Sequence, residues 1–472
     1  MTILQCPLRT AIALAAFCAL HLSAPAEVIT VPNADPIARV DRIVRTALAK
    51  TGVPSVSLAV VEDGRLMYTQ AYGTARQKPR LEARPDLPYS IGSISKQFTA
   101  AAILLLQEEH RLSLADKVGK WLPELTRAND ITVRQVLSMT SGYQDYAPQD
   151  YMVPEWSRPI SPDEILTRWA KKPLDFEPGT QWQYSNTNYV IAGLIVEKLS
   201  GEPLMEFLRR RFFSPLGIGT VYDSNFAALP ETDPQGYFRR GLGLLRPAPH
   251  EGTGWMYAAG ELAMTAADLA KWDISVLRRS LLSPDSYAQM QTEVLLASGA
   301  GVHYGLGVGV SLTDGHRQIE HSGEVSGFTA ENILLPEDNF AVVVLTNQDA
   351  TSAANAIATQ IRDDFLKTAQ GADPSQDALV RRVFDQLRSG NIDRSLFTAN
   401  CNAYFSAQAL SDYAHGMADS GEPQSFEFIK RQRRGGMLHS VYQAKFSHQT
   451  LLLNLYQVAD NKFEQFLVEA KE

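Results

Sequence analysis

The chain has 472 residues, of which 45% are hydrophobic and 20% charged, and its formal net charge at pH 7 is −8. This length predicts two or three domains, and the composition is typical of a folded globular protein. The acidic balance argues against nucleic-acid binding, which normally requires a basic domain or stripe. The sequence has neither a cluster of metal ligands nor a glycine-rich nucleotide loop, so we expect no cofactor.

Residues 1–26 have the pattern of a secretory signal peptide. Arg9 precedes an apolar run from Ala11 to Leu22, and Ala24-Pro25-Ala26 resembles a cleavage site. We therefore expect a periplasmic or secreted protein, with a retained anchor as the alternative. No later apolar run approaches the ~20 residues of a membrane span. Only Cys401 would remain of the three cysteines, which excludes an intramolecular disulfide.

The mature chain begins with a predicted helix over Asp35–Thr51, where apolar residues recur at helical spacing. A β-hairpin follows. Its strands, Ser55–Val61 and Leu66–Tyr72, flank Asp63-Gly64, and an Asp-Gly pair between two such runs favours a tight turn.

The next stretch joins a turn of small residues directly to an apolar helix that reaches Leu106. Ser93 and Lys96 lie three residues apart at its start, so one helix face can bring hydroxyl and amine together. A serine becomes a nucleophile when a neighbouring base takes its proton. Burial of the helix would lower the pKa of Lys96 and make it that base. The alternative is that Ser93 only caps the helix and Lys96 is solvated.

The middle of the chain alternates short helices with irregular segments. Helices are predicted at Ile131–Ser138, Val190–Leu199 and Pro203–Phe213, and another begins after Thr265. The stretch from Ala147 to Pro173 has little periodicity, and we expect it to be an irregular wall facing the substrate.

Three consecutive strands are predicted near the end of this part. They cover 317–323, 328–335 and 340–347, and a helix over Ala353–Lys367 follows them. Strands at both ends of a domain with helices between them predict an antiparallel sheet whose first and last strands meet.

A predicted linker at 370–375 leads to a C-terminal accessory domain, residues 376–472. A helix over Leu379–Leu387 and four strand-like runs resemble the small α+β domains of the nuclear-transport-factor-2-like (NTF2-like) class. This domain is a candidate for homodimer formation or ligand capture. The basic run Lys430–Arg434 beside Gly435-Gly436 is typical of a solvated hairpin end.

Three motifs occur in a fixed order: Ser93-Ile94-Ser95-Lys96, Tyr184-Ser185-Asn186 in an expected loop, and His321-Ser322-Gly323 on an expected strand. Together they resemble the Ser-x-x-Lys, Tyr-x-Asn and Lys-Thr-Gly signatures of the serine β-lactamase and penicillin-binding-protein superfamily. The resemblance is closest to class C β-lactamases and related esterases and D-amino-acid-specific peptidases, over residues 36–368. It implies an α+β fold, with an antiparallel sheet flanked by helices and a helical lobe.

The resemblance also implies roles for individual residues. Ser93 would attack a carbonyl and become acylated, while Lys96 and Tyr184 would share the proton transfers, because cationic neighbours can hold a phenol or an amine in its basic form. Asn186 would bind an acyl side-chain amide or fix Lys96. The backbone N–H groups of Ser93 and Glu324 would bind the oxyanion. Alternatively, Tyr184 is a buried core residue and Asn186 a turn former.

The third motif departs from the family pattern. His321 stands where β-lactamases carry a lysine, and Glu324 follows Gly323 where alanine or serine is common. A lysine attracts the carboxylate of a penicillin or of a peptide terminus, whereas a histidine with an ordinary pKa near 6.5 does so only partly. Efficient β-lactam hydrolysis is therefore not expected, and we assign His321, Gly323, Glu324 and Asn186 to substrate binding.

The sequence thus predicts a secreted serine hydrolase that forms an acyl-enzyme at Ser93 and acts on a small-molecule or peptide substrate. Esterase or D-amino-acid-type peptidase activity fits the third motif better than the alternatives, a β-lactamase or a DD-carboxypeptidase. A further alternative is a catalytically silent module that binds cell-wall peptides.

Overall fold

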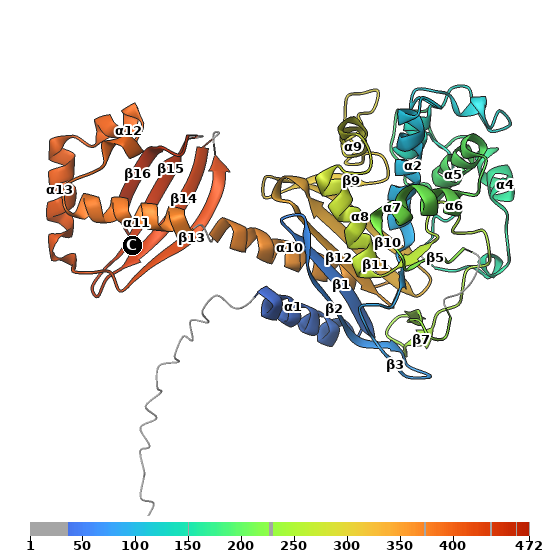
Figure 1. The fold of residues 1–472 in the computed structure, drawn as a ribbon, viewed down its shortest axis with the longest axis horizontal. Helices are drawn as coiled ribbons and strands as arrows, with labels where there is room; N and C mark the ends of the chain where they lie inside the picture. Colours follow the sequence, from blue (N-terminus) through green and yellow to red (C-terminus); the bar gives the residue numbers. More distant parts are fainter. Residues whose placement is uncertain are drawn as a thin grey trace, which may run out of the picture.

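The computed structural model describes residues 36–149, 151–225, 230–371, 374–434, 437–458 and 460–471. The predicted signal peptide, residues 1–26, lies outside the described residues. Figure 1 shows a larger part, built on a broad sheet surrounded by helices, and a smaller C-terminal part with its own sheet and helices. The predicted α+β fold class is confirmed.

The larger part is organised around a seven-stranded sheet with the order β3-β2-β1-β12-β11-β10-β9. As predicted, the first and last long strands meet, because β1 (Ser55–Glu62) pairs antiparallel with β12 (Phe340–Thr346). The other strands are β2 (Arg65–Arg76), β3 (Leu81–Glu82), β9 (Gly309–Thr313), β10 (His316–Val325) and β11 (Phe328–Leu335). Asp63 and Gly64 both have positive φ, as the tight turn of the predicted hairpin requires.

Both faces of this sheet are buried, because alternate residues of β1 enter two different cores. Val56, Leu58 and Val60 face a core shared with α1 (Pro36–Thr51) and α10 (Ala353–Gly371). Ala59 and Val61 face the larger core, which includes α8 (Ala266–Arg278). The sheet is therefore the middle layer between two sets of helices.

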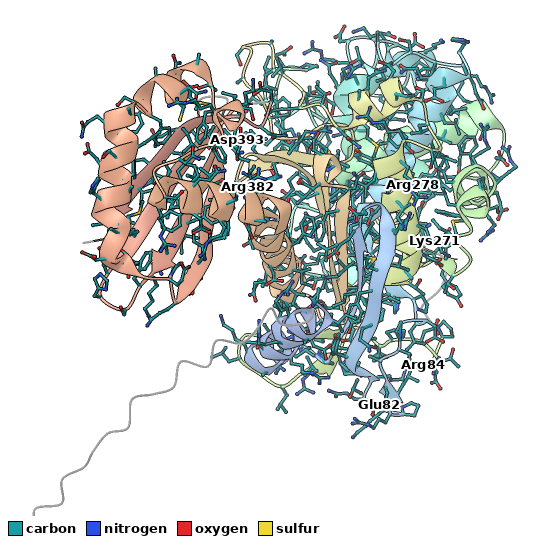
Figure 2. All side chains as sticks on the ribbon, turned by 60° about the vertical axis from the view of Figure 1, so that its left-hand side comes forward. Glu82, Arg84, Lys271, Arg278, Arg382 and Asp393 are labelled. Atoms are coloured by element: carbon teal, nitrogen blue, oxygen red, sulfur yellow. The ribbon has the colours of Figure 1, made fainter. Side chains whose placement is uncertain are left out.

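Two cations tie α8 to its surroundings, and both are labelled in Figure 2. Arg278 donates a hydrogen bond of 2.9 Å to the carbonyl of Gly64 in the β1–β2 turn. Lys271 donates to the carbonyl of Gly217 at 2.6 Å and pairs with Asp268 one turn earlier. These contacts fix the helix at both ends.

A helical lobe lies beside the sheet, and α2 (Lys96–Glu108) runs through its centre. Every residue of α2 from Lys96 to Leu106 is buried, so this helix is apolar all round except at its first turn. The other helices here are α3 (Val133–Leu137), α4 (Pro162–Ile165), α5 (Asn186–Ser200), α6 (Leu204–Leu208), α7 (Ser214–Leu216) and α9 (Pro284–Met290). Short strands complete this part: β4 (Tyr89–Ser90), β5 (Val221–Asp223), β6 (Tyr237–Phe238), β7 (Arg246–Pro247) and β8 (Leu262–Met264).

The stretch from Ala147 to Pro173 is less irregular than we expected from its sequence. It contains a 3₁₀ turn at Pro154–Ser157, then α4, which continues as a π-helix over Leu166–Ala170. Ser161 caps α4 through a bond from the N–H of Glu164. The helical periodicity was hidden because these elements are only four or five residues long.

The C-terminal part packs three helices against a four-stranded antiparallel sheet, in the order β13-β14-β15-β16. Its elements are α11 (Pro374–Arg388), α12 (Ala399–Tyr404), α13 (Ala407–Met417), β13 (Ser425–Arg434), β14 (Met437–Lys445), β15 (Thr450–Gln457) and β16 (Phe463–Ala470). At the linker predicted at 370–375, α10 extends to Gly371 and α11 begins at Pro374, and residues 372–373 lie outside the described residues. The domain boundaries at 368 and 376 stay predictions.

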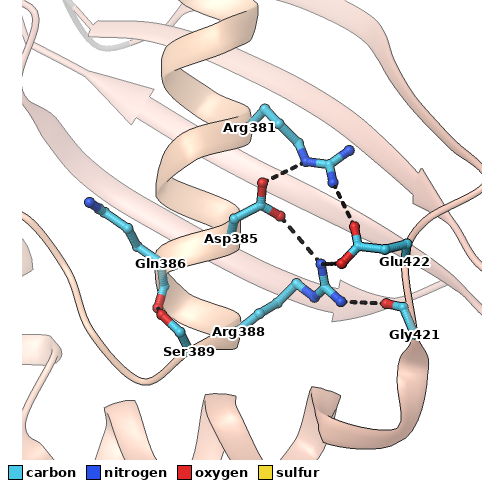
Figure 3. Close-up of polar contacts among 7 residues, drawn as sticks. All are labelled: Arg381, Asp385, Gln386, Arg388, Ser389, Gly421 and Glu422. Carbon is cyan, nitrogen blue, oxygen red and sulfur yellow. Dashed lines mark hydrogen bonds and ion pairs between the residues drawn. The ribbon is translucent and has the colours of Figure 1, made fainter.

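A network of ions joins α11 to the segment that precedes β13 (Figure 3). Asp385 accepts hydrogen bonds from Arg381 at 2.9 Å and from Arg388 at 3.3 Å. The same two arginines reach Glu422, at 3.2 and 3.4 Å, and Arg388 also donates to the carbonyl of Gly421. Four charges that share partners hold the helix in place better than isolated surface pairs would.

Candidate active site

Ser93 and Lys96 meet at the start of α2. Gly92–Ser95 forms a 3₁₀ turn that leads into the α-helix, and Lys96 Nζ lies 2.8 Å from Ser93 Oγ. Lys96 Nζ also donates to Asn186 Oδ1 at 2.8 Å and to the carbonyl of Ala259 at 2.7 Å. Ser93 makes no capping hydrogen bond, and Lys96 is fully buried, so the capping alternative does not describe this site.

Burial decides the protonation of Lys96. Removal from water disfavours the ammonium form and lowers the pKa of Lys96 to about 7, against the smaller opposing effect of the Asp145 carboxylate. A large share of the amine is therefore unprotonated at neutral pH. An unprotonated amine 2.8 Å from a serine hydroxyl can accept its proton.

Tyr184 also lies beside the amine of Lys96. Lys96 Nζ lies 5.0 Å from the centroid of the Tyr184 ring and 5.5 Å from that of Tyr189. Burial raises the pKa of Tyr184, although its hydrogen bond with Ser93 pulls this pKa back down. The expectation that neighbouring charges hold this phenol in its basic form is therefore wrong: Tyr184 keeps its proton and can pass one on.

Asn186 is the first residue of α5, not a loop residue as predicted. Its Oδ1 accepts from Lys96, while its backbone N–H and its Nδ2 donate to Asp145 Oδ1 at 2.8 and 3.2 Å. Of the two roles expected for Asn186, this geometry supports the one that fixes Lys96.

The proposed oxyanion donors lie side by side because two glycines allow β10 to approach the turn before α2. A Cβ atom on Gly323 would lie 1.9 Å from the carbonyl oxygen of Ile91 and 3.4 Å from the nitrogen of Ser93. One on Gly92, which has φ +51°, would lie 2.7 Å from the nitrogen of Glu324. These close approaches bring the backbone nitrogens of Ser93 and Glu324 near each other, as expected of two donors to one oxyanion.

His321 is held as a neutral ring. Its Nδ1 lies 2.6 Å from the carbonyl of Ser322, which can only accept, so Nδ1 carries the proton. Its Nε2 then accepts from the hydroxyl of Tyr304 at 3.0 Å. Burial, with a smaller contribution from nearby Lys96, lowers the pKa of His321 to about 4. The partial positive charge expected here from an ordinary histidine pKa is absent at neutral pH.

These groups open into one cleft of about 580 Å³. It is lined by Ser93, Tyr184, Asn186, His321 and Glu324, so the residues predicted from three distant motifs do converge. The first residues of the expected substrate wall also line it, among them Ala147, Tyr151 and Met152.

Four carboxyl groups give the cleft its polar character: Asp145, Glu251, Glu324 and Asp349. Asp145 accepts from the backbone N–H groups of Ala147 and Asn186, and the other three also bind backbone amides. Glu251 accepts from Ser326 at 2.7 Å, Asp349 from Gly327 at 3.0 Å, and Glu324 from Ala350 at 2.7 Å. Among the described residues that line the cleft, none is a lysine or an arginine.

Sequence reasoning missed Asp145, Tyr304 and the carbonyl of Ala259. Asp145 follows Gly142 by three residues in a stretch that carries no motif of its own. Tyr304 lies 17 residues before His321 in the chain, with strand β9 between them, and meets it only in the folded protein. A backbone carbonyl leaves no trace in the residue type. Over the part of the chain that the structure describes, no group of three or more His, Cys, Asp or Glu side chains could hold a metal ion. Within the same residues, no helix is long and apolar enough to cross a membrane.

A serine paired with a buried lysine, beside a tyrosine and two neighbouring backbone amides, is the arrangement expected of a serine hydrolase. A family model described as Beta-lactamase matches residues 40–365, well over half of the chain. The chain therefore belongs to this family, and the resemblance to the superfamily of β-lactamases and penicillin-binding proteins is confirmed.

Similar proteins agree with this assignment. PbpX of Bacillus subtilis strain 168, named as a penicillin-binding protein, is 26% identical over 291 residues, which span 61% of this chain and 69% of PbpX. A D-stereospecific amidohydrolase from Streptomyces sp. has a TM-score of 0.60 and 28% identity, over 68% of this chain and 96% of that one. The octameric penicillin-binding protein homologue from Pyrococcus abyssi has a TM-score of 0.62 over 92% of this chain and 100% of that one; at 22% identity it shows the fold alone.

The contact between Gly323 and Ile91 gives a test of the oxyanion site. Gly323→Ala would push β10 away from the Ser93 turn and separate the two N–H groups, so we expect acylation by an ester to slow by ~10²-fold or more, as when one oxyanion donor is lost. Gly219→Ala is the matched control, because a Cβ there meets nothing within 4 Å. Equal acylation rates for both variants would contradict this assignment of the donors.

Proposed function

We propose that this protein is a secreted or periplasmic serine hydrolase that forms an acyl-enzyme at Ser93 and cleaves amide or ester bonds, as an esterase or a D-amino-acid-type peptidase. The observation that carries the proposal is the 2.8 Å contact between Ser93 Oγ and the buried amine of Lys96, whose pKa burial lowers to about 7. A binding module would gain nothing from burying an amine beside a hydroxyl, since the burial costs free energy.

The reaction follows from the contacts around the amine. Lys96 takes the proton of Ser93, Ser93 Oγ bonds to the substrate carbonyl carbon, and the two backbone amides bind the resulting oxyanion. The bond to the leaving nitrogen or oxygen then breaks. Tyr184 gives its hydroxyl proton to that atom and is reprotonated from Lys96. In the second half, water attacks the acyl carbon, its proton goes to Lys96, and Ser93 regains a proton as the acid leaves.

The charge of the cleft supports substrates without an obligatory carboxylate. Neutral His321 stands where related enzymes have a cation, and four carboxyl groups line the walls. A substrate carboxylate would find no lysine or arginine among the described residues that line the cleft, so its desolvation there would be costly. Esters, amides and peptides with a neutral or cationic acyl part are compatible with the groups that line this cleft. The likeness to a D-stereospecific amidohydrolase at 28% identity supports the amide branch.

Acyl-enzyme formation is tested by mass spectrometry of the intact protein. A fluorophosphonate should phosphonylate the parent chain once, with loss of fluoride, on the peptide that contains Ser93, and should leave Ser93→Ala unmodified. Turnover of p-nitrophenyl esters and D-alanyl amides should exceed turnover of nitrocefin. Absence of Ser93-dependent labelling would favour the silent binding module, and faster nitrocefin hydrolysis would favour the β-lactamase or carboxypeptidase alternative.

Position 321 gives a separate prediction about substrate selectivity. His321→Lys places a cation where related enzymes carry one, so we expect the ratio of kcat/KM for a penicillin to kcat/KM for an uncharged ester to rise at least ~10-fold, about the 1.4 kcal/mol of one ion contact. His321→Gln, which adds no charge, is the control and should leave the ratio near the parental value. A ratio that rises equally in both variants would show that charge at this position does not select the substrate.

The C-terminal part has no assigned role in this reaction. Self-association through it stays a prediction, which the octameric state of the Pyrococcus abyssi homologue supports only as an analogy.

A further inference from the structure

A chain of hydrogen bonds leads from the cleft wall to the amine of Lys96 through one amide. Asp145 binds Asn186 through both the backbone N–H and the side-chain Nδ2, and Asn186 Oδ1 binds Lys96 Nζ. We propose that Asp145 is a positioning residue, which fixes the amide of Asn186 and thereby aims the lone pair of Lys96 at the hydroxyl of Ser93. The inference rests on the proposed function, because it explains how the base of that reaction is oriented.

The first step is a count of donors around the amine. A neutral lysine amine has two N–H donors and one lone pair, and Lys96 Nζ has three oxygen partners within 2.8 Å. The carbonyl of Ala259 and the Oδ1 of Asn186 can only accept, so they take both N–H groups. The remaining partner, Ser93 Oγ, can donate. The lone pair therefore points at the hydroxyl whose proton must be removed.

This count holds only while Asn186 presents its oxygen to Lys96. A flipped amide would present Nδ2 instead, and the lone pair of Lys96 would accept from that N–H rather than from Ser93. Asp145 prevents the flip, because an ionised carboxylate only accepts and must face Nδ2. Asp145 is itself fixed by the backbone N–H of Ala147 at 3.2 Å and lies half-buried at the edge of the cleft.

Asp145 also acts on the charge of Lys96. The titratable groups that face the amine are Asp145, the phenols of Tyr184 and Tyr189, and the neutral ring of His321. Asp145 is the group whose negative charge favours the ammonium and keeps the pKa of Lys96 from falling further. It therefore stabilises the protonated lysine that exists after Ser93 has been deprotonated.

Asp145→Asn removes both effects with almost no change in shape. An asparagine at this position has no charge, and it can donate to Asn186 Oδ1 and so permit the flip of the Asn186 amide. We expect kcat/KM for p-nitrophenyl acetate to fall at least ~10-fold, a part of the ~10²–10⁴ that a positioned base contributes. We also expect the acid limb of kcat/KM to move to lower pH, because Lys96 loses the anion that holds its proton. A purely structural role of Asp145 would lower kcat/KM without moving the acid limb of its pH profile.

Two further variants make this test specific. Asp130→Asn removes an equal charge from an exposed ion pair with Arg127 and should keep the parental rate and limb. In an Asn186→Ala background, Asp145→Asn should lower the rate clearly less than tenfold further, because the contact that orients Asn186 is already lost and only the effect of the Asp145 charge on Lys96 remains. Parental kinetics in Asp145→Asn, or an undiminished tenfold loss in the Asn186→Ala background, would overturn the inference.

Two outcomes separate this inference from the proposed function. If the parent chain is not acylated at Ser93 by the fluorophosphonate, the proposed function fails and the inference fails with it. If the parent is acylated and Asp145→Asn reacts identically, only the inference fails. Should circular dichroism show that Asp145→Asn is unfolded, Asp145→Glu replaces it: its carboxylate keeps the charge but displaces Asn186, so the rate should fall while the acid limb stays, and an unchanged rate would overturn the inference.

Discussion

The site depends on the burial of one amine. Lys96 is the first residue of a helix whose next ten residues are all buried, so the ammonium form loses its hydration and the amine becomes a base near neutral pH. Three oxygen atoms form hydrogen bonds with this amine. Each comes from a different part of the chain: the turn before α2, the start of α5 and the segment before β8. Burial in the apolar core therefore lowers the pKa of Lys96 as well as stabilising the fold.

The central sheet also shapes this site, through strand β10. Strand β10 can approach the turn before α2 only because Gly92 and Gly323 lack side chains, and this approach places the nitrogens of Ser93 and Glu324 together. The antiparallel pairing of β10 with β11 fixes the register of that strand. The turn before α2 and the start of the helix therefore supply the nucleophile, the base and one anion-binding amide, and strand β10 supplies the second amide.

Much of this could be predicted from local sequence signals. Ser93 and Lys96 are neighbours on one helix face, and the Asp63-Gly64 hairpin is specified by its own turn. What could not be predicted depends on contacts between distant segments. The neutral state of His321 needs Tyr304 beside it, and the orientation of Asn186 needs Asp145. The helix α10 also continues through Gly371, against the turn-forming composition of that stretch, so local propensity alone did not predict where it ends.

The most direct measurement is the titration of the Lys96 amine itself, by NMR of protein labelled with ¹³C at the lysine ε-carbons, with Lys96→Arg used to assign the signal. The account predicts a midpoint near pH 7, far below the ~10.4 of an exposed lysine. A Lys96 signal that titrates with the other lysines would mean that the amine is solvated and protonated at neutral pH, and it would contradict the assignment of Lys96 as the base.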